Sequence, residues 1–343
     1  MECQKVMLYH LPIIAGDDND IDADRLGRDD MVINNCITAV TGGTENIIMD
    51  KNKEALCKIQ YMMSKGFFNG LNSCGIKYAV LKGCPLAYYK TGDPGSRLSS
   101  DIDILISRSD IDKATELLEA SGFQNSYALD RKERIMLVSN SHQIPSYSKC
   151  LGKCCVQIDV NFDLFWGEYK GKRIDVPEFL EGTAEMDIYG CRIRALPPLK
   201  CMVQVILHHY KEMNSLYHLT GHVAIRRRMF EDIYALCRRY PAEISIDRIY
   251  EAGQRYGILP YAYYMFYYTR QVYDDAILDG YLEALRTEEG RALLDCYGLS
   301  DQERKTWKIG FPERLEADLT EMVRAGLSGE DREKLERNRR LFG

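Results

Sequence analysis

The stretch IKYAVLKGCPLAYYKTGDPGSRLSSDIDILI, residues 76–106, decides the fold of this chain. Residues 76–81 are mostly apolar and end at Lys82-Gly83, a pattern typical of a buried strand followed by a tight turn. A short helix is expected from Pro85 to Lys90, because proline is well tolerated in the first turn of a helix. The first half of the stretch therefore predicts a strand, a turn and a helix.

The second half of the stretch is a loop that leads into another strand. Residues 91–100 are rich in turn formers, and residues 101–106 (DIDILI) alternate acidic and aliphatic side chains. Asp101 and Asp103 are two positions apart, so both carboxylates point to the same face. Two anions this close repel each other unless a cation lies between them, and short carboxylates suit hard divalent cations. The spacing indicates a metal site on this strand.

Flanking segments extend the α/β pattern. Apolar spacing predicts helices over residues 52–73 and 111–121, a hairpin from 135–138 and 143–147, and a strand over 155–162. In the last strand, Asp159 lies on the face opposite its aliphatic residues and would add a third carboxylate. Asp163 would share that face, and we favour Asp159 because the apolar alternation is cleanest around it.

After Pro197-Pro198 the pattern becomes helical. Helices are expected over residues 199–213, 224–240, 246–256 and most of 261–286, with a charged amphipathic helix in 310–343. We expect three parts, namely an irregular or helical extension (1–50), a catalytic domain (51–195) and a helical domain (196–343). The expected fold class is α+β, with a small mixed β-sheet flanked by helices and followed by a mostly helical C-terminal domain.

Composition excludes several classes of protein. The 343 residues are 45% hydrophobic and carry a formal net charge of −6, which argues against a sequence-blind nucleic-acid binder. No run of about 18 apolar residues is present, and the first 16 residues lack the basic and apolar regions of a secretory signal. The twelve cysteines are scattered, and the group Cys150, Cys154 and Cys155 lacks a second pair at zinc spacing. We therefore expect a cytoplasmic protein with reduced thiols.

The run Leu81-Lys82-Gly83, followed by Arg97 and by Asp101-Ile-Asp103-Ile-Leu105, resembles the nucleotidyltransferase superfamily. In that superfamily a Gly-Ser or Gly-Gly turn precedes an Asp-x-Asp strand. More narrowly, the chain resembles uncharacterised bacterial nucleotidyltransferases with a Leu-Lys-Gly, Arg and Asp-Ile-Asp pattern, which are similar in fold to the antibiotic nucleotidyltransferases and DNA polymerase β. The resemblance covers residues 52–240 and is strongest over 76–123.

The resemblance implies a set of site residues. It makes Asp101, Asp103 and Asp159 the catalytic carboxylates and the ligands of two Mg²⁺ ions. It also implies that Lys82, Gly83, Cys84 and Arg97 bind a nucleoside triphosphate (NTP). Cys84 departs from the pattern, because serine or glycine normally touches the phosphates there.

The implied reaction moves a nucleoside monophosphate (NMP) group from an NTP, ATP being one candidate, to a hydroxyl of an acceptor, with release of pyrophosphate. We expect a small-molecule acceptor and no membrane or nucleic-acid partner. Two alternatives stay open, namely a toxin-like enzyme that modifies protein or RNA and a non-catalytic nucleotide-binding module. The sequence leaves the NTP, the acceptor and the oligomeric state undetermined.

Three weaker features lie in the helical half. His208 and His209 are adjacent and point about 100° apart on a helix, so we expect one at the domain interface and one exposed. Arg226–Arg228 is interpreted as a solvated face, the alternative being that one arginine reaches the triphosphate. The tyrosines between 256 and 273 are expected to pack helices together, with a stacking surface as the alternative.

Overall fold

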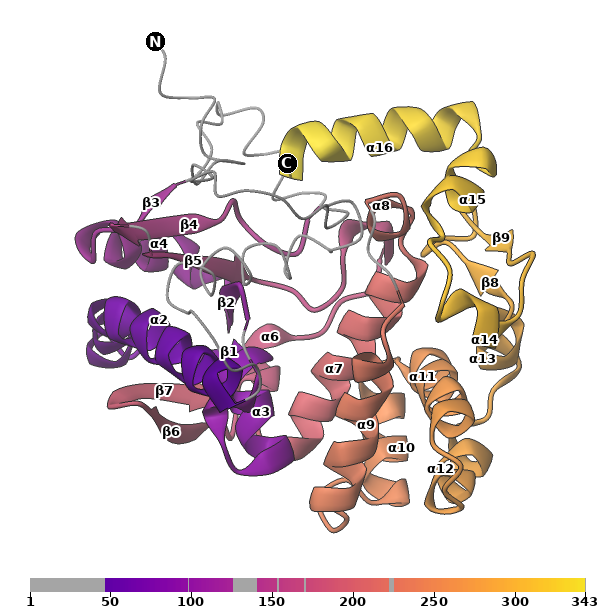
Figure 1. Cartoon of the computed structure of the whole chain (residues 1–343), viewed down its shortest axis with the longest axis horizontal. Coiled ribbons are helices and arrows are strands. Elements are labelled where there is room, and N and C mark those ends of the chain that lie inside the picture. The colour runs from indigo at the N-terminus through magenta and orange to yellow at the C-terminus, as the bar shows by residue number, and fades with distance from the viewer. Residues whose placement is uncertain are drawn as a thin grey trace.

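The computed structural model describes residues 47–97, 99–125, 141–152, 154–169, 171–221 and 225–342. A mixed β-sheet with flanking helices is followed by a mostly helical C-terminal part, which confirms the expected α+β class (Figure 1). Within these residues no helix has the length and apolar character needed to cross a membrane. The extension predicted for 1–50 lies almost wholly outside the described residues.

The sheet is built around the two strands of the quoted stretch. Its order is β3-β4-β5-β2-β1-β7-β6. Strand β2 pairs antiparallel with β1 and parallel with β5, so it is central. The strand bounds are β1 Tyr78–Leu81, β2 Asp101–Ile106, β3 Gln124–Asn125, β4 Tyr147–Leu151, β5 Cys154–Asn161, β6 Ala184–Ile188 and β7 Cys191–Ala195.

Helices pack on both faces of the sheet, and the chain after β7 is mostly helical. In the first half they are α2 Ile47–Ser73, α3 Gly83–Thr91, α4 Ile111–Ala120 and α6 Val176–Phe179. In the second half they are α7 Pro198–Asn214, α8 Leu216–Leu219, α9 Arg227–Arg239, α10 Ile246–Arg255, α11 Leu259–Val272, α12 Ile277–Leu285, α13 Glu288–Leu293, α14 Phe311–Arg314, α15 Thr320–Ala325 and α16 Gly329–Phe342. A two-stranded hairpin, β8 Cys296–Tyr297 and β9 Lys305–Thr306, interrupts them.

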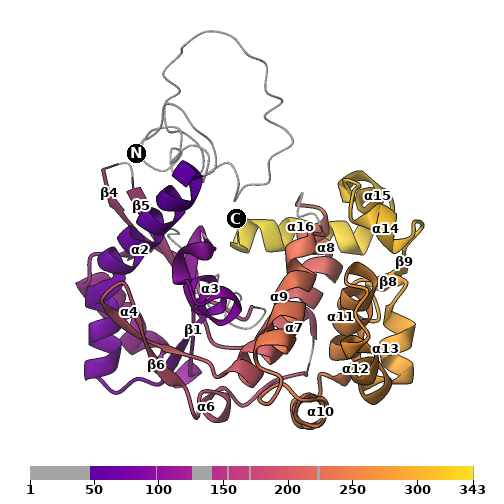
Figure 2. The same ribbon diagram turned by 60° about the horizontal axis from the view of Figure 1, so that its bottom comes forward.

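Two apolar clusters hold the described part together. One packs α2 and α4 on the face of the sheet that carries Ile102, Ile104 and Ile158. The other joins the opposite face to the C-terminal helices and includes Leu81 and Leu105. Since side chains alternate along β2, this pattern turns the odd-numbered acids away from the first cluster. Helix α9 packs against both α7 and α3, which ties the helical part to the sheet (Figure 2).

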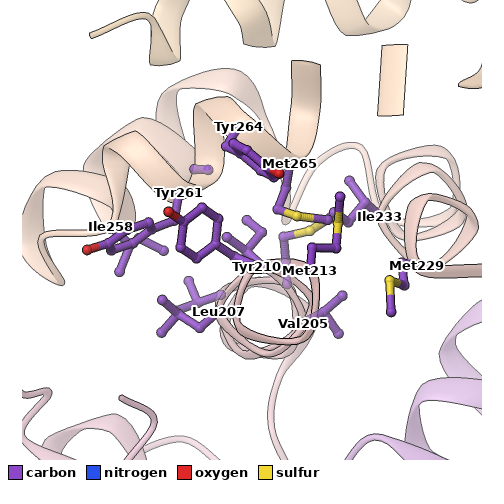
Figure 3. Packing of buried hydrophobic residues seen from close by; sticks show 14 of the residues in the cluster. Val205, Leu207, Tyr210, Met213, Met229, Ile233, Ile258, Tyr261, Tyr264 and Met265 are labelled. Carbon is purple, nitrogen blue, oxygen red and sulfur yellow. The ribbon is translucent and has the colours of Figure 1, made fainter. Parts of the chain in front are cut away.

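The tyrosines of α11 form part of the second cluster. Tyr261 and Tyr264 are buried against Tyr210 of α7, beside Met213 and Met265 (Figure 3). Tyr268 is buried as well and makes an edge contact with Tyr264. The expected packing role of these tyrosines is confirmed.

Several boundaries differ from the predictions. The helix expected over most of 261–286 is two helices, since Tyr273 is extended after α11, and the Asp275 carboxylate accepts the Ile277 N–H just before α12. The 143–147 strand is displaced to β4, and its expected partner 135–138 lies outside the described residues. Strands β6 and β7 were not predicted, although Cys191, Ile193 and Ala195 alternate with two arginines.

One cysteine prediction is wrong. Cys150 and Cys155 form a disulfide across the β4–β5 hairpin, where the antiparallel register places them directly opposite each other. Cys154 is free. Reduced thiols remain the state of the other described cysteines, most of which are buried.

Candidate active site

A polar cleft of about 270 Å³ lies between the sheet and helix α7. Asp101, Asp103 and Asp159 all line it, together with Lys82 and Arg97. Residues from α7 form the opposite wall at helical spacing, namely Gln204, His208, His209, Lys211 and Glu212. A larger and more open hollow of about 770 Å³ lies elsewhere, beside the end of α2 and strands β6 and β7, and contains none of these carboxylates.

The three acids meet because of the register between β2 and β5. Asp103 lies directly opposite Asp159 on the parallel strands, and Asp101 lies opposite Gln157. The Gln157 amide donates to Asp159 Oδ1 at 3.1 Å, and the Asn161 amide donates to Asp103 Oδ1 at 3.3 Å. Neighbouring amides on β5 therefore hold two of the carboxylates in place.

The carboxylates repel one another. Burial, followed by repulsion from Asp103 and Asp159, raises the pKa of Asp101 to about 7. Burial and the Asp103 charge also raise the pKa of Asp159. For Asp103, burial acts in the same direction, but the adjacent Lys82 ammonium outweighs it and holds the pKa below its usual value. The cluster thus carries more negative charge than its protein neighbours neutralise.

A turn after β1 brings a cation to the acids. Lys82 Nζ lies 2.7 Å from Asp103 Oδ2 and 3.5 Å from His208 Nε2. Both Lys82 and Gly83 have positive φ values, 49° and 46°, so the turn is sharply left-handed before α3 begins. A Cβ on Gly83 would meet only Ser99 Cβ, at 3.8 Å.

Cys84 points away from the cleft. Its thiol belongs to the apolar cluster under α2, where hydrogen bonding to Cys57 and burial raise its pKa. It does not line the cleft. The side chain of Cys84, the residue that departs from the superfamily pattern, is therefore part of the apolar core.

Arg97 is bound by a residue that the sequence did not single out as its partner. Its Nη1 lies 2.6 Å from Asp232 Oδ2 of α9. Asp232 is fully buried and also binds Lys90 Nζ at 2.7 Å and His209 Nε2 at 3.0 Å. Burial alone would raise the pKa of Asp232, but Arg97 and the other donors hold it far below its usual value. This four-residue Asp232 cluster joins the loop before β2 to the helical part.

The expectation that one of the two histidines is exposed is wrong, whereas a histidine at the interface between the sheet and the helical part is observed. Neither is exposed, and both line the cleft, because Glu212 one turn later binds them together. Its carboxylate oxygens lie 3.3 Å from His208 Nε2 and 3.4 Å from His209 Nδ1. Burial, partly opposed by Glu212, lowers the pKa of His208 to about 3. Arg228 is exposed and lines the cleft mouth.

Sequence reasoning missed Glu212, Lys211, His142 and His218 as cleft residues. A polar stripe at 204, 208, 211 and 212 on an otherwise apolar helix was the available signal for the first two. Asp163, the alternative third carboxylate, also lines the cleft, but its Oδ1 accepts the N–H groups of Leu164 and Phe165.

The donor set suits a divalent cation. Three carboxylates from adjacent strands converge in one cleft, and burial together with mutual repulsion raises the pKa of Asp101 to about 7. Hard cations such as Mg²⁺ take oxygen ligands of this kind. A bound cation would relieve the repulsion among the carboxylates, so these residues fit the Mg²⁺ ions that the family resemblance implies.

Three solved structures are similar to this chain. An antigenic nucleotidyltransferase-like protein from Paracoccidioides brasiliensis shares 19% identity over 53% of this chain and 75% of its own, with a TM-score of 0.33. The antibiotic-resistance factor ANT(2'')-Ia shares 14% identity over 59% and 95%, with a TM-score of 0.35. The Megavirus polyadenylate synthase shares 14% over 74% and 47%, with a TM-score of 0.30. No curated protein matches the chain.

A sequence model of one protein family matches residues 64–274. That range holds β1, β2, β5, α7 and α9, and with them all the described carboxylates of the cleft. The family is described as uncharacterised nucleotidyltransferases. Since the match spans more than half of the sequence, this chain belongs to the uncharacterised nucleotidyltransferase family.

Proposed function

We propose that the protein is a Mg²⁺-dependent enzyme that moves an NMP group from an NTP to a hydroxyl of a small acceptor and releases pyrophosphate. The observation that carries this proposal is the convergence of Asp101, Asp103 and Asp159 in one cleft beside the Lys82 turn. Phosphoryl-type transfer needs little from the protein except positioning and neutralisation of charge. The cleft contains carboxylates that can position metal ions and a lysine that can neutralise phosphate charge.

The three carboxylates would hold the Mg²⁺ ions. When bound, the metal supplies charge neutralisation for the phosphates and acidifies the acceptor hydroxyl. Gln157 and Asn161 keep two of the carboxylate oxygens oriented, so the ligand set is fixed before substrate arrives.

The chain's own groups divide the remaining work. Lys82, whose ammonium lies at the junction of the turn and the acids, neutralises negative charge that develops on the phosphates. The left-handed turn at Gly83 lets the backbone at the start of α3 approach a phosphate closely. Asp159 has a raised pKa and therefore accepts the acceptor's proton more readily than a solvated aspartate does.

Arg97 acts indirectly in this scheme. Its guanidinium is bound to Asp232, so we assign it to holding the loop that leads into Asp101 rather than to a direct phosphate contact. The Cys84 thiol, buried beside Cys57, does not enter the cleft. The Cys84 departure therefore gives no observation in favour of a non-catalytic module, and no observation favours the toxin-like alternative.

The test is a labelling experiment. The purified protein is incubated with each α-³²P-labelled NTP, Mg²⁺ and a cell extract, and both labelled products and pyrophosphate are measured. Asp101→Asn and Asp103→Asn should abolish transfer and remain folded, whereas Asp112→Asn, an exposed carboxylate on α4, serves as the matched control. Absence of label and of pyrophosphate with every NTP, or full activity in either cleft variant, would overturn the proposal.

A further inference from the structure

We propose that Lys211 of α7 binds an anionic group, a phosphate or a carboxylate, on the acceptor substrate. The inference rests on the proposed function and deepens it, because it assigns the acceptor to the class of anionic small molecules. It also assigns a specificity-determining residue on the helical wall of the cleft.

The first observation is that Lys211 is a buried cation that forms no direct ion pair in the described part of the chain, although Glu212, Asp103 and Glu168 lie near enough to favour its charged form. Lys211 lines the cleft, is only 8% exposed and, within the described residues, forms no ion pair with a carboxylate. Two other cations of the cleft, the half-buried Lys82 and Arg97, bind Asp103 and Asp232 respectively. Burying an ammonium that lacks a direct ion pair is costly, so an anionic ligand that pairs with it would offset part of that cost.

The contacts of the Lys211 ammonium are with uncharged rings, which leaves the ammonium able to bind an anion. Its Nζ lies 3.2 Å from His142 Nε2 and 4.9 Å from the centre of the Trp166 ring. These two rings orient the ammonium and carry no negative charge, and the nearby carboxylates of Glu212, Asp103 and Glu168 do not form a direct ion pair with it. Burial and repulsion from Lys82 lower the pKa of Lys211 to about 8, so most molecules still carry the charge at pH 7.

The position of Lys211 points to the acceptor rather than the nucleotide. The sheet order is β5-β2-β1, and the Lys82-Gly83 turn follows β1 on one side of the carboxylates. His142, which contacts Lys211, is tied to the other side, since its carbonyl accepts the Phe162 N–H at the end of β5. In the proposed reaction this is the side of Asp159, which takes the acceptor's proton.

The chemistry selects a class of acceptor. A phosphate ester or a carboxylate would pair with the ammonium in a water-poor cleft and form a charge-assisted hydrogen bond. A cationic group placed at this position would meet a like charge, so Lys211 favours an anionic group there over a cationic one. His218 also lines the cleft and is neutral near pH 7, because burial and Lys211 lower its pKa to about 3.

The test measures binding, not turnover. Inorganic phosphate and malonate, the two probes, are titrated separately into wild type, Lys211→Met and Lys82→Met, each with and without Mg²⁺ and a non-hydrolysable ATP analogue. Lys211→Met should weaken binding of at least one probe by about tenfold or more, while affinity for the ATP analogue stays within about twofold. Lys82→Met should show the opposite preference. Which probe binds then distinguishes a phosphate acceptor from a carboxylate acceptor.

Lys172→Met is the matched control, because Lys172 also lies over a ring, that of Tyr261, but outside the cleft. The inference is overturned if Lys211→Met binds both probes like wild type, or if it loses the ATP analogue and the probes equally. Failure of the proposed function would give a different result. The protein would then neither bind the ATP analogue nor release pyrophosphate, while Lys211→Met would still bind phosphate or malonate more weakly than wild type. Should Lys211→Met not fold, amine acetylation of wild-type Lys211 is quantified by mass spectrometry, and lack of protection by either probe also overturns the inference.

Discussion

The Arg97 guanidinium lies 2.6 Å from the Asp232 carboxylate, although 135 residues separate them in the chain. The pair connects the loop that precedes Asp101 to helix α9. Lys90 of α3 and His209 of α7 bind the same carboxylate, so a single buried anion holds three segments that surround the cleft.

Asp232→Asn should destabilise the protein strongly. The variant removes the carboxylate that pairs with the Arg97 guanidinium in a largely buried setting and leaves Lys90 with Glu231 as its remaining partner, and breaking such a cluster costs about 3–5 kcal/mol. Urea unfolding of the variant and wild type measures the difference. Asp279→Asn, which removes an exposed partner of Arg270, should cost less than about 1 kcal/mol. Equal losses in the two variants would contradict the role of the Asp232 cluster.

The sequence was sufficient to predict the elements whose pattern lies in consecutive residues, such as strand 101–106 and the turn after residue 81. Strand 101–106 was predicted with its observed bounds, because two acids alternate with isoleucines and an aliphatic run follows them. The placement of Asp101 and Asp103 on one face followed from the same period. The bend at Lys82-Gly83 was visible as a glycine directly after an apolar run.

Other features depend on long-range contacts that leave no local pattern. Nothing near Arg97 indicates that its partner is Asp232. One of His208 and His209 was wrongly predicted to be exposed, because helical geometry alone does not reveal that the Glu212 carboxylate contacts both rings in the cleft. In the sequence, Lys211 is not distinguished from the other polar residues of α7, and its burial beside His142 and Trp166 is visible only in the structure.

Mg²⁺ should stabilise the protein through the carboxylates. Binding to the folded state alone adds about 2.7 kcal/mol when the ion is at a hundred times its Kd. Thermal unfolding with Mg²⁺ and the non-hydrolysable ATP analogue should therefore show a Tm increase of a few degrees in wild type and in Asp112→Asn. Asp103→Asn should lose this increase, since it removes a carboxylate from the centre of the cluster. A full Mg²⁺ shift in Asp103→Asn, at matched ionic strength, would argue against these ligands.

Glu168 should make stability depend on pH. Burial and repulsion from Glu303 raise its pKa to about 7, against 4.5 for an unperturbed glutamate. The unfolded chain therefore releases this proton first, and stability falls as the pH rises from about 4.5 to about 7. Glu168→Gln removes the penalty and should be more stable than wild type by about 1–3 kcal/mol at pH 8, with little difference near pH 4.

Urea unfolding of both proteins across that pH range measures the effect of Glu168. Glu181→Gln, a change at an exposed carboxylate paired with Lys77, is the control and should show no such gain at pH 8. A constant difference between Glu168→Gln and wild type at all pH values would mean that Glu168 ionises normally in the folded protein.

Two glycines should respond in opposite directions to alanine. Gly83 has a φ of 46°, and its Cβ would meet nothing nearer than Ser99 Cβ at 3.8 Å, so Gly83→Ala introduces backbone strain without a clash. That strain costs about 1–2 kcal/mol. Gly66 lies inside α2, where a Cβ would sit 3.6 Å from Ser121 Oγ, and Gly66→Ala should gain about 0.5–1 kcal/mol. Urea unfolding separates the two effects. If Gly83→Ala were as stable as Gly66→Ala, the left-handed turn beside Asp103 would not require glycine, and the close approach of backbone to phosphate proposed there would lose its support.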